Sequence, residues 1–272
     1  MNKRISACFE IAANDKRPVL GVFATAGDPS ESEADRILDR LVENGADFIE
    51  LGMPFSDPMA DGPAIQAASL RALAAGMTLP KTLSMAARFR ARHPDTPLIL
   101  MGYYNPIYSY GTERFIANAV DGGVDGLIVV DLPPEEDAEL CDPSRAAGLA
   151  FIRLVTPTTL GERLVTVIEK AGGFVYYVAI AGITGTKSAD VASIEAAVSR
   201  IKEVTALPVV TGFGIRTPEQ AREAGSKGDG VVVGSAIVSL IADADSAERS
   251  RDGFIADKIG NFCATLSKAV RE

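Results

Sequence analysis

Residues 18–52 read PVLGVFATAGDPSESEADRILDRLVENGADFIELG and contain one complete strand–helix–strand unit. The near-continuous apolar run at 18–24 is typical of a strand in a parallel sheet that is covered on both faces. Residues 31–44 carry apolar side chains at helical spacing, with Ser30 as a candidate N-cap and Gly45 as a C-terminal stop. A second apolar run, DFIELG, follows directly. The stretch therefore predicts a βαβ unit with parallel strands.

The same unit recurs along the whole chain. Strand and helix patterns alternate eight times, which is the signature of a (β/α)8 barrel of about 250 residues. A doubly wound open sheet is the alternative, but the first turn lacks the G-x-G-x-x-G dinucleotide fingerprint. We predict an α/β protein: a single (β/α)8 TIM barrel over residues 1–272, with an extra N-terminal helix and a short phosphate-binding helix after strand 8. The predicted strands are 18–24, 47–52, 97–103, 124–131, 149–155, 173–179, 207–212 and 229–233. The predicted helices are 2–13, 31–44, 63–92, 112–121, 135–147, 160–171, 188–204, 217–225 and 252–270.

Composition limits the possible partners. The chain has 272 residues, is 47% hydrophobic and carries a net charge of −9 at pH 7. This charge argues against nucleic acid or an anionic membrane surface, although backbone N–H groups can still bind a small phosphate. The three cysteines are far apart and odd in number, which indicates reduced thiols in a cytoplasmic protein. No run approaches the roughly 18 apolar residues that a membrane span needs.

Glu50 is the first candidate for chemistry. On the second predicted strand, alternation places Ile49 and Leu51 on one side and Phe48 and Glu50 on the other. If the apolar pair packs on the helices, Glu50 points into the barrel mouth, where active sites of this fold lie. Burial there raises the pKa of a carboxyl toward the range in which it donates as well as accepts a proton. The alternative is a structural ion pair with an Arg or Lys, and position alone does not separate the two.

The segment after this strand, LGMPFSDPMADGPAIQAAS, places Asp57 and Asp61 on a βα loop at the same face. Its three prolines and two glycines make it longer and more ordered than a plain connection requires, which favours a functional loop. The alternative is that Asp61 only caps the helix that opens at Pro63.

A phosphate site is predicted at the last two strands. They end in TGFGI (211–215) and GSAIV (234–238), and barrels often bind phosphate with these two loops and a helix N-terminus. Gly214 and Gly234 let the backbone approach an anion, and Gly234 with Ser235 opens a helix whose N–H groups and dipole favour negative charge. The alternative is that these are ordinary turn glycines.

The residue inventory narrows the reaction class. His93 is the only histidine and precedes the third strand, so we expect a turn or capping residue on the face opposite the active site. One misplaced histidine supplies neither isomerase-type proton transfer nor a zinc aldolase site. No lysine lies in a predicted strand, which argues against a Schiff-base aldolase. Metal-free acid/base chemistry by carboxylates on a phosphorylated substrate remains.

The run ELGMPFSDPMADGPAIQ (50–66) resembles the signature of the tryptophan synthase α-subunit family. The similarity extends over nearly the whole chain. The family commonly has a serine where Ala179 stands and a valine where Ile183 stands, and KGDG before the last strand is also unusual. These departures concern the loop after strand 6 rather than the carboxylates. Further matching segments are GDP (27–29), MGYYNPI (101–107), DLPPEE (131–136), GITG (182–185), GFGI (212–215) and GSAIV (234–238).

The resemblance implies a lyase that splits indole-3-glycerol phosphate into indole and glyceraldehyde 3-phosphate. In such an enzyme Glu50 is the acid/base carboxylate and Asp61 holds the indole N–H. Protonation of indole C3 makes the ring itself the electron sink, so no lysine is needed. Which group takes the side-chain hydroxyl proton stays open. The implied substrate-binding residues are Phe23, Met101, Tyr176, Thr184, Gly185, Phe213, Gly214, Gly234 and Ser235.

The resemblance also implies a partner. We expect no metal and no cofactor in this chain, a β subunit that carries pyridoxal phosphate, and an α2β2 heterotetramer in the cytoplasm. Two alternatives remain at this point: a stand-alone lyase that works without a partner, and a non-catalytic subunit that only activates one. Intact Glu50 and Asp61 argue against the second alternative.

Overall fold

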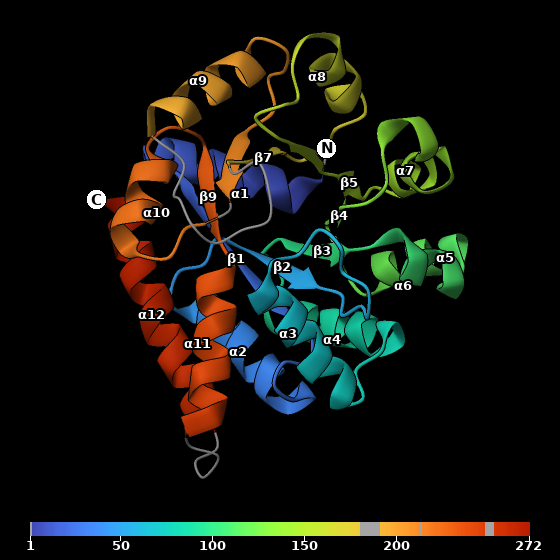
Figure 1. Ribbon diagram of the computed structural model, residues 1–272, viewed down its shortest axis with the longest axis vertical. Coiled ribbons are helices and arrows are strands. Elements are labelled where there is room, and N and C mark those ends of the chain that lie inside the picture. Colours follow the sequence, from blue (N-terminus) through green and yellow to red (C-terminus); the bar gives the residue numbers. More distant parts are fainter. Residues whose placement is uncertain (1, 180–190, 213, 248–252) are drawn as a thin grey trace.

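The computed structural model describes residues 2–179, 191–212, 214–247 and 253–272. Within them, nine parallel strands form one sheet that curls into a barrel surrounded by helices (Figure 1). The eight predicted strands are confirmed, and the fifth is divided at Ile152. The strands are β1 (Val19–Thr25), β2 (Phe48–Gly52), β3 (Leu98–Gly102), β4 (Gly126–Val129), β5 (Ala150–Phe151), β6 (Arg153–Val155), β7 (Val175–Val178), β8 (Val209–Gly212) and β9 (Gly230–Val233).

The divided fifth strand joins the two ends of the sheet. The strand order is β5-β4-β3-β2-β1-β9-β8-β7-β6. β5 pairs with β4, and β6 pairs with β7. Ile152 connects the two pieces, and its N–H donates to the carbonyl of Leu127 at 2.9 Å. The two ends of the sheet are therefore brought together, and the fold is the predicted (β/α)8 barrel.

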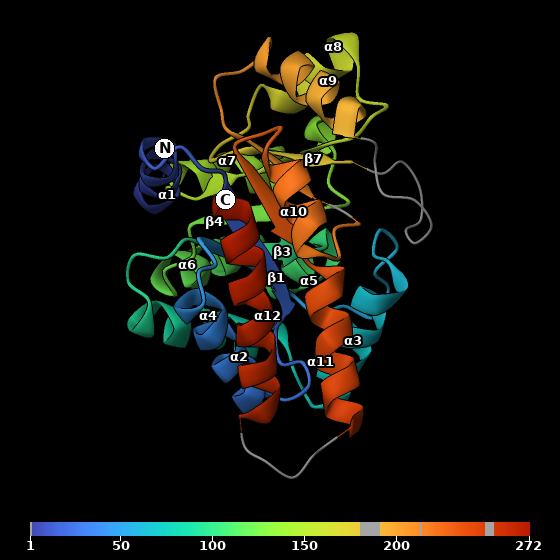
Figure 2. The same ribbon diagram turned by 90° about the vertical axis from the view of Figure 1, so that its left-hand side faces the viewer.

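Helices follow the strands in the predicted alternation. They are α1 (Lys3–Asn14), α2 (Glu31–Glu43), α3 (Pro63–Ala74), α4 (Leu79–Arg92), α5 (Tyr104–Tyr110), α6 (Thr112–Asp121), α7 (Ala138–Ala146), α8 (Gly161–Ile168), α9 (Val191–Lys202), α10 (Pro218–Gly225), α11 (Ser235–Ala247) and α12 (Phe254–Arg271), with a short 3-10 turn, η1, at Pro134–Glu136. Ser30 caps α2 as expected, and Pro218 stands at the start of α10. The extra helix after the last strand, α11, begins at Ser235 and has 13 residues. Figure 2 shows α11 and α12 side by side on the outside of the barrel.

Two helical predictions need correction. The predicted helix 63–92 is two helices, because Gly76 takes a φ of +82° that ends α3, and Thr78 then caps α4. Helix α5, which begins one residue after β3, was not predicted from the sequence. The N–H of its first residue, Tyr104, donates to the Asp131 carboxylate at 2.8 Å. That bond joins residues 27 positions apart, so a local sequence pattern does not predict this helix start.

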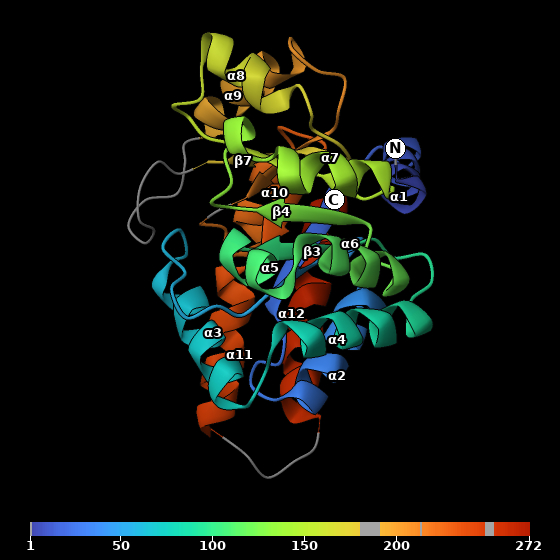
Figure 3. The same cartoon turned by 90° about the vertical axis from the view of Figure 1, so that its right-hand side faces the viewer.

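The predicted N-terminal helix, α1, closes the N-terminal end of the barrel. Its Ile5 and Ala12 are buried in the same apolar cluster as the barrel interior, and Phe9 packs on Phe174 with ring centroids 5.7 Å apart. Figure 3 shows α1 at one end of the barrel and the loop between β2 and α3 at the other, and Figure 2 agrees. Because α1 fills the N-terminal end, access to the interior lies at the C-terminal ends of the strands.

Alternate residues of each strand face the barrel axis or the surrounding helices. On β2, Phe48 belongs to the inner cluster, whereas Ile49 and Leu51 belong to the outer cluster against the helices. Glu50, between them, therefore points inward, as alternation predicts. The strand residues of the inner cluster are Val19, Phe23, Phe48, Ile99, Ile128, Ala150, Ile152, Phe174, Tyr176, Val178, Val210 and Val232.

Three aspartates tie neighbouring strands together at the N-terminal end of the barrel. Asp47, Asp125 and Asp229 each stand directly before a strand. Each carboxylate accepts a backbone N–H of the adjacent strand, at 2.8, 2.9 and 2.7 Å, and the aspartate's own N–H donates to the carbonyl of that same residue. The partners are Leu20, Leu98 and Val209. Each aspartate thus satisfies a strand-opening N–H and fixes the register of one βαβ unit.

Asp125 is the most buried of the three. It has no exposed surface and also accepts from Arg4 of α1 at 3.0 Å and Arg90 of α4 at 2.6 Å. One carboxylate therefore joins the helix that closes the barrel, a peripheral helix and two strands.

We expect Asp125→Ala to lower the free energy of unfolding by about 3 kcal/mol, because it leaves Arg90 and a buried N–H without their shared acceptor. Asp229→Ala removes the equivalent bond where the aspartate side chain is 39% exposed, so its loss should be smaller, about 1 kcal/mol. Urea unfolding of the two variants measures both values. Equal losses would contradict the role of burial.

Candidate active site

Glu50 lies inside the barrel, and its carboxyl has no hydrogen-bond partner in the described part of the chain. The residue is 1% exposed. Its register neighbours are Phe23 on β1 and Ile99 on β3, both apolar. Burial raises the pKa of Glu50 from its usual 4.5 to about 8. The alternative of a structural ion pair with Arg or Lys is thereby excluded for the described part of the chain.

Small residues make room for large ones around this carboxyl. A side chain on Gly52 would lie 2.5 Å from the Phe23 ring, and one on Gly212 would lie 2.0 Å from the Tyr176 hydroxyl. Tyr176 is 4% exposed, and its pKa is raised by burial and, next, by the nearby Glu50. The two glycines thus allow Phe23 and Tyr176 to lean across the mouth toward Glu50.

Asp61 lies above this layer, on the loop between β2 and α3. The N-cap of α3 is Gly62, with no side-chain cap, so the predicted alternative in which Asp61 caps the helix is wrong. Its carboxyl is hydrogen-bonded to Tyr103 instead. Burial raises the pKa of Asp61 from 3.8 to about 6, and the Tyr103 bond partly opposes that shift. Asp57, on the same loop, is exposed, and its carboxylate accepts the Ser56 hydroxyl at 2.5 Å.

A pocket at the mouth brings several predicted residues together. Asp61, Phe23 and Met101 line it, as does Gly52, which stands two residues beyond Glu50 on the inward face of β2. Two residues of a strand span about 7 Å, so the buried carboxyl lies one layer below this pocket. The full lining is Phe23, Thr25, Gly52, Met53, Asp61, Ile65, Ser69, Met101, Gly102, Tyr103 and Val130.

The predicted phosphate side is formed by neighbouring strands. β8 and β9 pair in parallel, so their C-terminal ends lie together. Gly214, after β8, has a φ of +79°, and α11 begins at Ser235. A side chain on Gly234 would lie 3.3 Å from Phe23, so this glycine adjoins the mouth. The arrangement places a helix N-terminus and two glycines at one edge of the mouth.

Comparison with known proteins decides the family. The family model for the tryptophan synthase alpha chain matches residues 9–269. The chain belongs to the tryptophan synthase alpha-chain family. Tryptophan synthase subunit alpha from Legionella pneumophila str. Paris is 38% identical, with 99% of this chain and 98% of that chain covered and a TM-score of 0.90. A structure from Aquifex aeolicus VF5 is 36% identical over 99% of both chains, with a TM-score of 0.89. Mycobacterium tuberculosis tryptophan synthase is 30% identical over 100% of both chains, with a TM-score of 0.89.

Membership of the tryptophan synthase alpha-chain family gives the reaction. The chain is a lyase of tryptophan biosynthesis that cleaves indole-3-glycerol phosphate to indole and glyceraldehyde 3-phosphate. The lyase class and the barrel predicted from the sequence are both confirmed. Among the described residues, no helix is long and apolar enough to cross a membrane, and no group of three or more His, Cys, Asp or Glu side chains is placed to hold a metal ion.

Three predicted substrate-binding residues, Thr184, Gly185 and Phe213, lie outside the residues that the structure describes. Thr25 and Tyr103 are among the residues of the pocket that were not predicted. Thr25 is 3% exposed, and its hydroxyl has no hydrogen-bond partner among the described residues. Its position two residues beyond Phe23 was the available signal, because alternation puts both on the inward face. Tyr103 carried no such signal.

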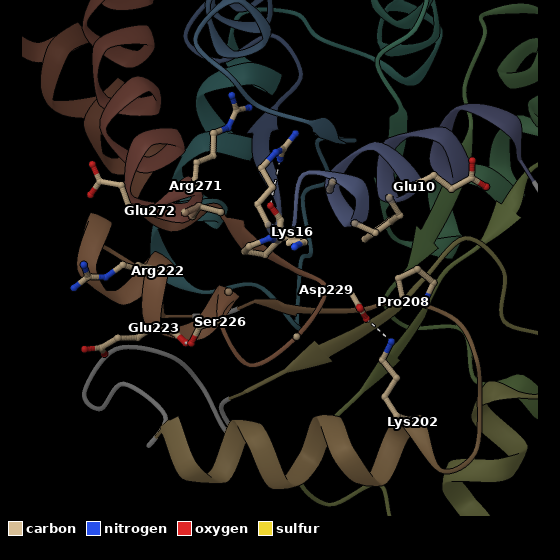
Figure 4. Close-up of a pocket in the computed structure, with 18 of the residues that line it drawn as sticks. Glu10, Lys16, Lys202, Pro208, Arg222, Glu223, Ser226, Asp229, Arg271 and Glu272 are labelled. Atoms are coloured by element: carbon tan, nitrogen blue, oxygen red, sulfur yellow. Dashed lines mark hydrogen bonds and ion pairs between the residues drawn. The ribbon is translucent and has the colours of Figure 1, made fainter.

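A cavity of about 930 Å³ lies at the opposite end of the barrel, among α1, α9, α10 and α12 (Figure 4). Three of its basic side chains are paired: Lys202 with Asp229, as Figure 4 shows, and Arg17 and Arg271 both with Asp47. His93 is also on this side of the fold, where it ends α4 as predicted and its Nε2 lies 2.7 Å from Asp39. The cavity therefore lies at the N-terminal end of the barrel, and Glu50 and Asp61 lie toward the other end.

Glu50→Gln should stabilise the protein increasingly as pH rises. Between pH 4.5 and about 8 the folded protein binds one proton more than the unfolded chain, so the free energy of unfolding falls through this window. Glutamine has no charge to bury, so its gain in Tm over wild type should be larger at pH 8 than at pH 5. The exposed Glu113→Gln is the control and should show no such trend. An equal gain at both pH values would mean that Glu50 is not desolvated.

Proposed function

We propose that residues 1–272 form one barrel domain in which Glu50 and Asp61 are the catalytic pair. The observation that carries the proposal is the placement of the two carboxyls: Glu50 is buried among apolar side chains, and Asp61 lines the pocket one layer above it. Burial raises the pKa of Glu50 to about 8 and that of Asp61 to about 6. At pH 7 the first is protonated and the second is ionised. Two carboxyl groups held in opposite protonation states at one site are suited to act as acid and as charge-stabilising acceptor.

In the proposed mechanism Glu50 donates its proton to C3 of the indole ring. The ring becomes an indolenine cation, and the ionised Asp61 accepts the N–H and stabilises the charge that develops there. The bond from C3 to the hydroxyl-bearing carbon then breaks, and its electron pair returns to the ring to give indole. The hydroxyl on the same carbon gives up its proton to a base of the site, so this carbon becomes the aldehyde and the enzyme ends with as many protons as it began. No water is consumed and no external electron sink is needed.

The substrate's two ends fit different parts of the mouth. Phe23 and Met101 offer apolar surface to the indole ring, and Tyr176 stands next to Glu50. At the other edge, backbone N–H groups at Gly214, Gly234 and Ser235 are proposed to bind the phosphate together with the α11 dipole. Gly185, Thr184 and Phe213 complete the proposed set.

We further propose a cytoplasmic α2β2 heterotetramer in which pyridoxal phosphate is held by a β subunit and no cofactor by this chain. Large apolar side chains are exposed on three loops or helices around the mouth: Met59 is 82% exposed, Tyr108 60% and Leu160 51%. Met59 is two residues from Asp61, so a partner seated there contacts the loop that carries a catalytic carboxylate. Indole is apolar and diffuses away readily, and direct transfer to the partner would prevent that loss.

Asp61→Asn should lower kcat by about a hundredfold and change KM much less, because the charge on the indole nitrogen develops only in the transition state. Asp57→Asn, on the same loop but exposed, is the matched control and should retain kcat within about twofold. In wild type, kcat/KM should fall below about pH 6 and above about pH 8, where Asp61 gains and Glu50 loses its proton. A raised KM with unchanged kcat would remove Asp61 from the transition state.

The isolated chain should be a slow lyase that a β subunit accelerates at least about tenfold, a change of roughly 1.4 kcal/mol in the barrier. Met59→Asp should weaken this activation while leaving basal cleavage intact. Ile11→Asp is the control, since Ile11 is 57% exposed but lies on α1 at the other end of the barrel. Indole release at saturating substrate, with β subunit titrated in, measures the effect. A flat titration with a fast isolated chain would favour the stand-alone lyase.

A further inference from the structure

We propose that Tyr103 is a positioning residue that holds the loop between β2 and α3 and orients the Asp61 carboxylate by a hydrogen bond from its hydroxyl. This inference rests on the proposed role of Asp61, because it assigns the residue that makes that carboxylate ready to act.

Tyr103 is itself firmly fixed. It directly follows β3 and is the N-cap residue of α5, where the next N–H in the chain, from Tyr104, is held by Asp131. Its side chain is buried, with 3% of the residue exposed. Below it, the N–H of Met53 donates to the carbonyl of Met101 at 2.8 Å and anchors the start of the neighbouring loop. A ring held between a strand end and a helix start is a rigid support.

From this position Tyr103 contacts both ends of the loop. Near its start, the ring packs on Phe55 with centroids 5.4 Å apart. Near its end, the hydroxyl oxygen accepts the N–H of Ala60 at 3.0 Å. The same hydroxyl is hydrogen-bonded to the Asp61 carboxyl. One side chain thus spans the loop that carries the carboxylate.

The direction of the second bond follows from donor counting. A tyrosine hydroxyl has one proton to donate, and the Ala60 N–H occupies an acceptor site on its oxygen. The proton is therefore free to go to Asp61, which accepts when ionised. A bond of this kind to a charged acceptor is stronger and more directional than a neutral one. It favours the ionised form of Asp61 against the effect of burial.

Few other charged groups act on Asp61. Among the described residues that line its pocket, Tyr103 is the one other titratable side chain. Asp57, on the same loop, is turned to Ser56, and Glu50 lies one layer deeper. Loss of the Tyr103 hydroxyl should therefore raise the pKa of Asp61, whereas loss of ring packing alone should not.

Tyr103→Phe separates the two roles, because phenylalanine keeps the ring against Phe55 and lacks the hydroxyl. We expect kcat to fall about tenfold with KM changed less than about threefold. The acid limb of the profile of kcat/KM against pH should move to higher pH by at least about half a unit. Tyr108→Phe, on the exposed face of α5, is the control and should leave both unchanged when all variants are assayed without a β subunit. Thermal unfolding verifies that each variant is folded.

The same substitution in an Asp61→Asn background completes a double-mutant cycle. If Tyr103 acts through Asp61, it should add less than about a twofold loss there. An equal loss in both backgrounds, or an unmoved acid limb in Tyr103→Phe, would overturn the proposal. An active Asp61→Asn enzyme would instead overturn the proposed role of Asp61, so the two failures are distinguishable.

Discussion

The burial of an unpaired carboxyl is the constraint on which the rest of this structure depends. Desolvation alone raises the pKa of Glu50 to about 8, and that shift requires that no cation or donor of the described chain reaches it. The barrel meets this requirement with apolar neighbours, Phe23 and Ile99, in register on either side. A group buried in this way lowers the stability of the folded protein at neutral pH. The same environment is what lets a carboxyl donate a proton at that pH.

The opposite end of the barrel contains the contacts that stabilise the fold. There α1 fills the interior with apolar side chains, and three aspartates each bond both backbone groups of one residue in the adjacent strand. Asp125 alone joins two arginines and two strands. Carboxyl groups therefore serve two purposes in one fold. The aspartates at the N-terminal end hold backbone groups and cations, whereas Glu50 at the other end has no partner in the described chain.

Asp61, the second carboxylate of the mouth, is held in place in a different way. Asp61 is carried by a loop, not by a strand, so its position depends on contacts made by that loop. The described structure supplies them from the end of β3 through Tyr103, which bonds the backbone at Ala60 and the carboxyl itself. The same loop exposes Met59. A surface that is available to a partner and a residue of the site therefore lie on one segment. A partner that contacts this loop can therefore change the position of Asp61 without changing the packing of the strands.

The sequence by itself determined the alternation of strands and helices, the inward direction of Glu50 and the family. These follow from local periodicity and from one long motif, and both are written in consecutive residues. The division of helix 63–92 at Gly76 and the helix α5 were missed, since a left-handed φ and a cap from Asp131 depend on conformation and on a distant residue. Aspartates often cap helices, so the sequence left open that Asp61 caps α3. In the structure its carboxyl instead faces Tyr103. That contact joins segments more than 40 residues apart, and only the closing of the barrel, which sets neighbouring strand ends side by side, could decide it.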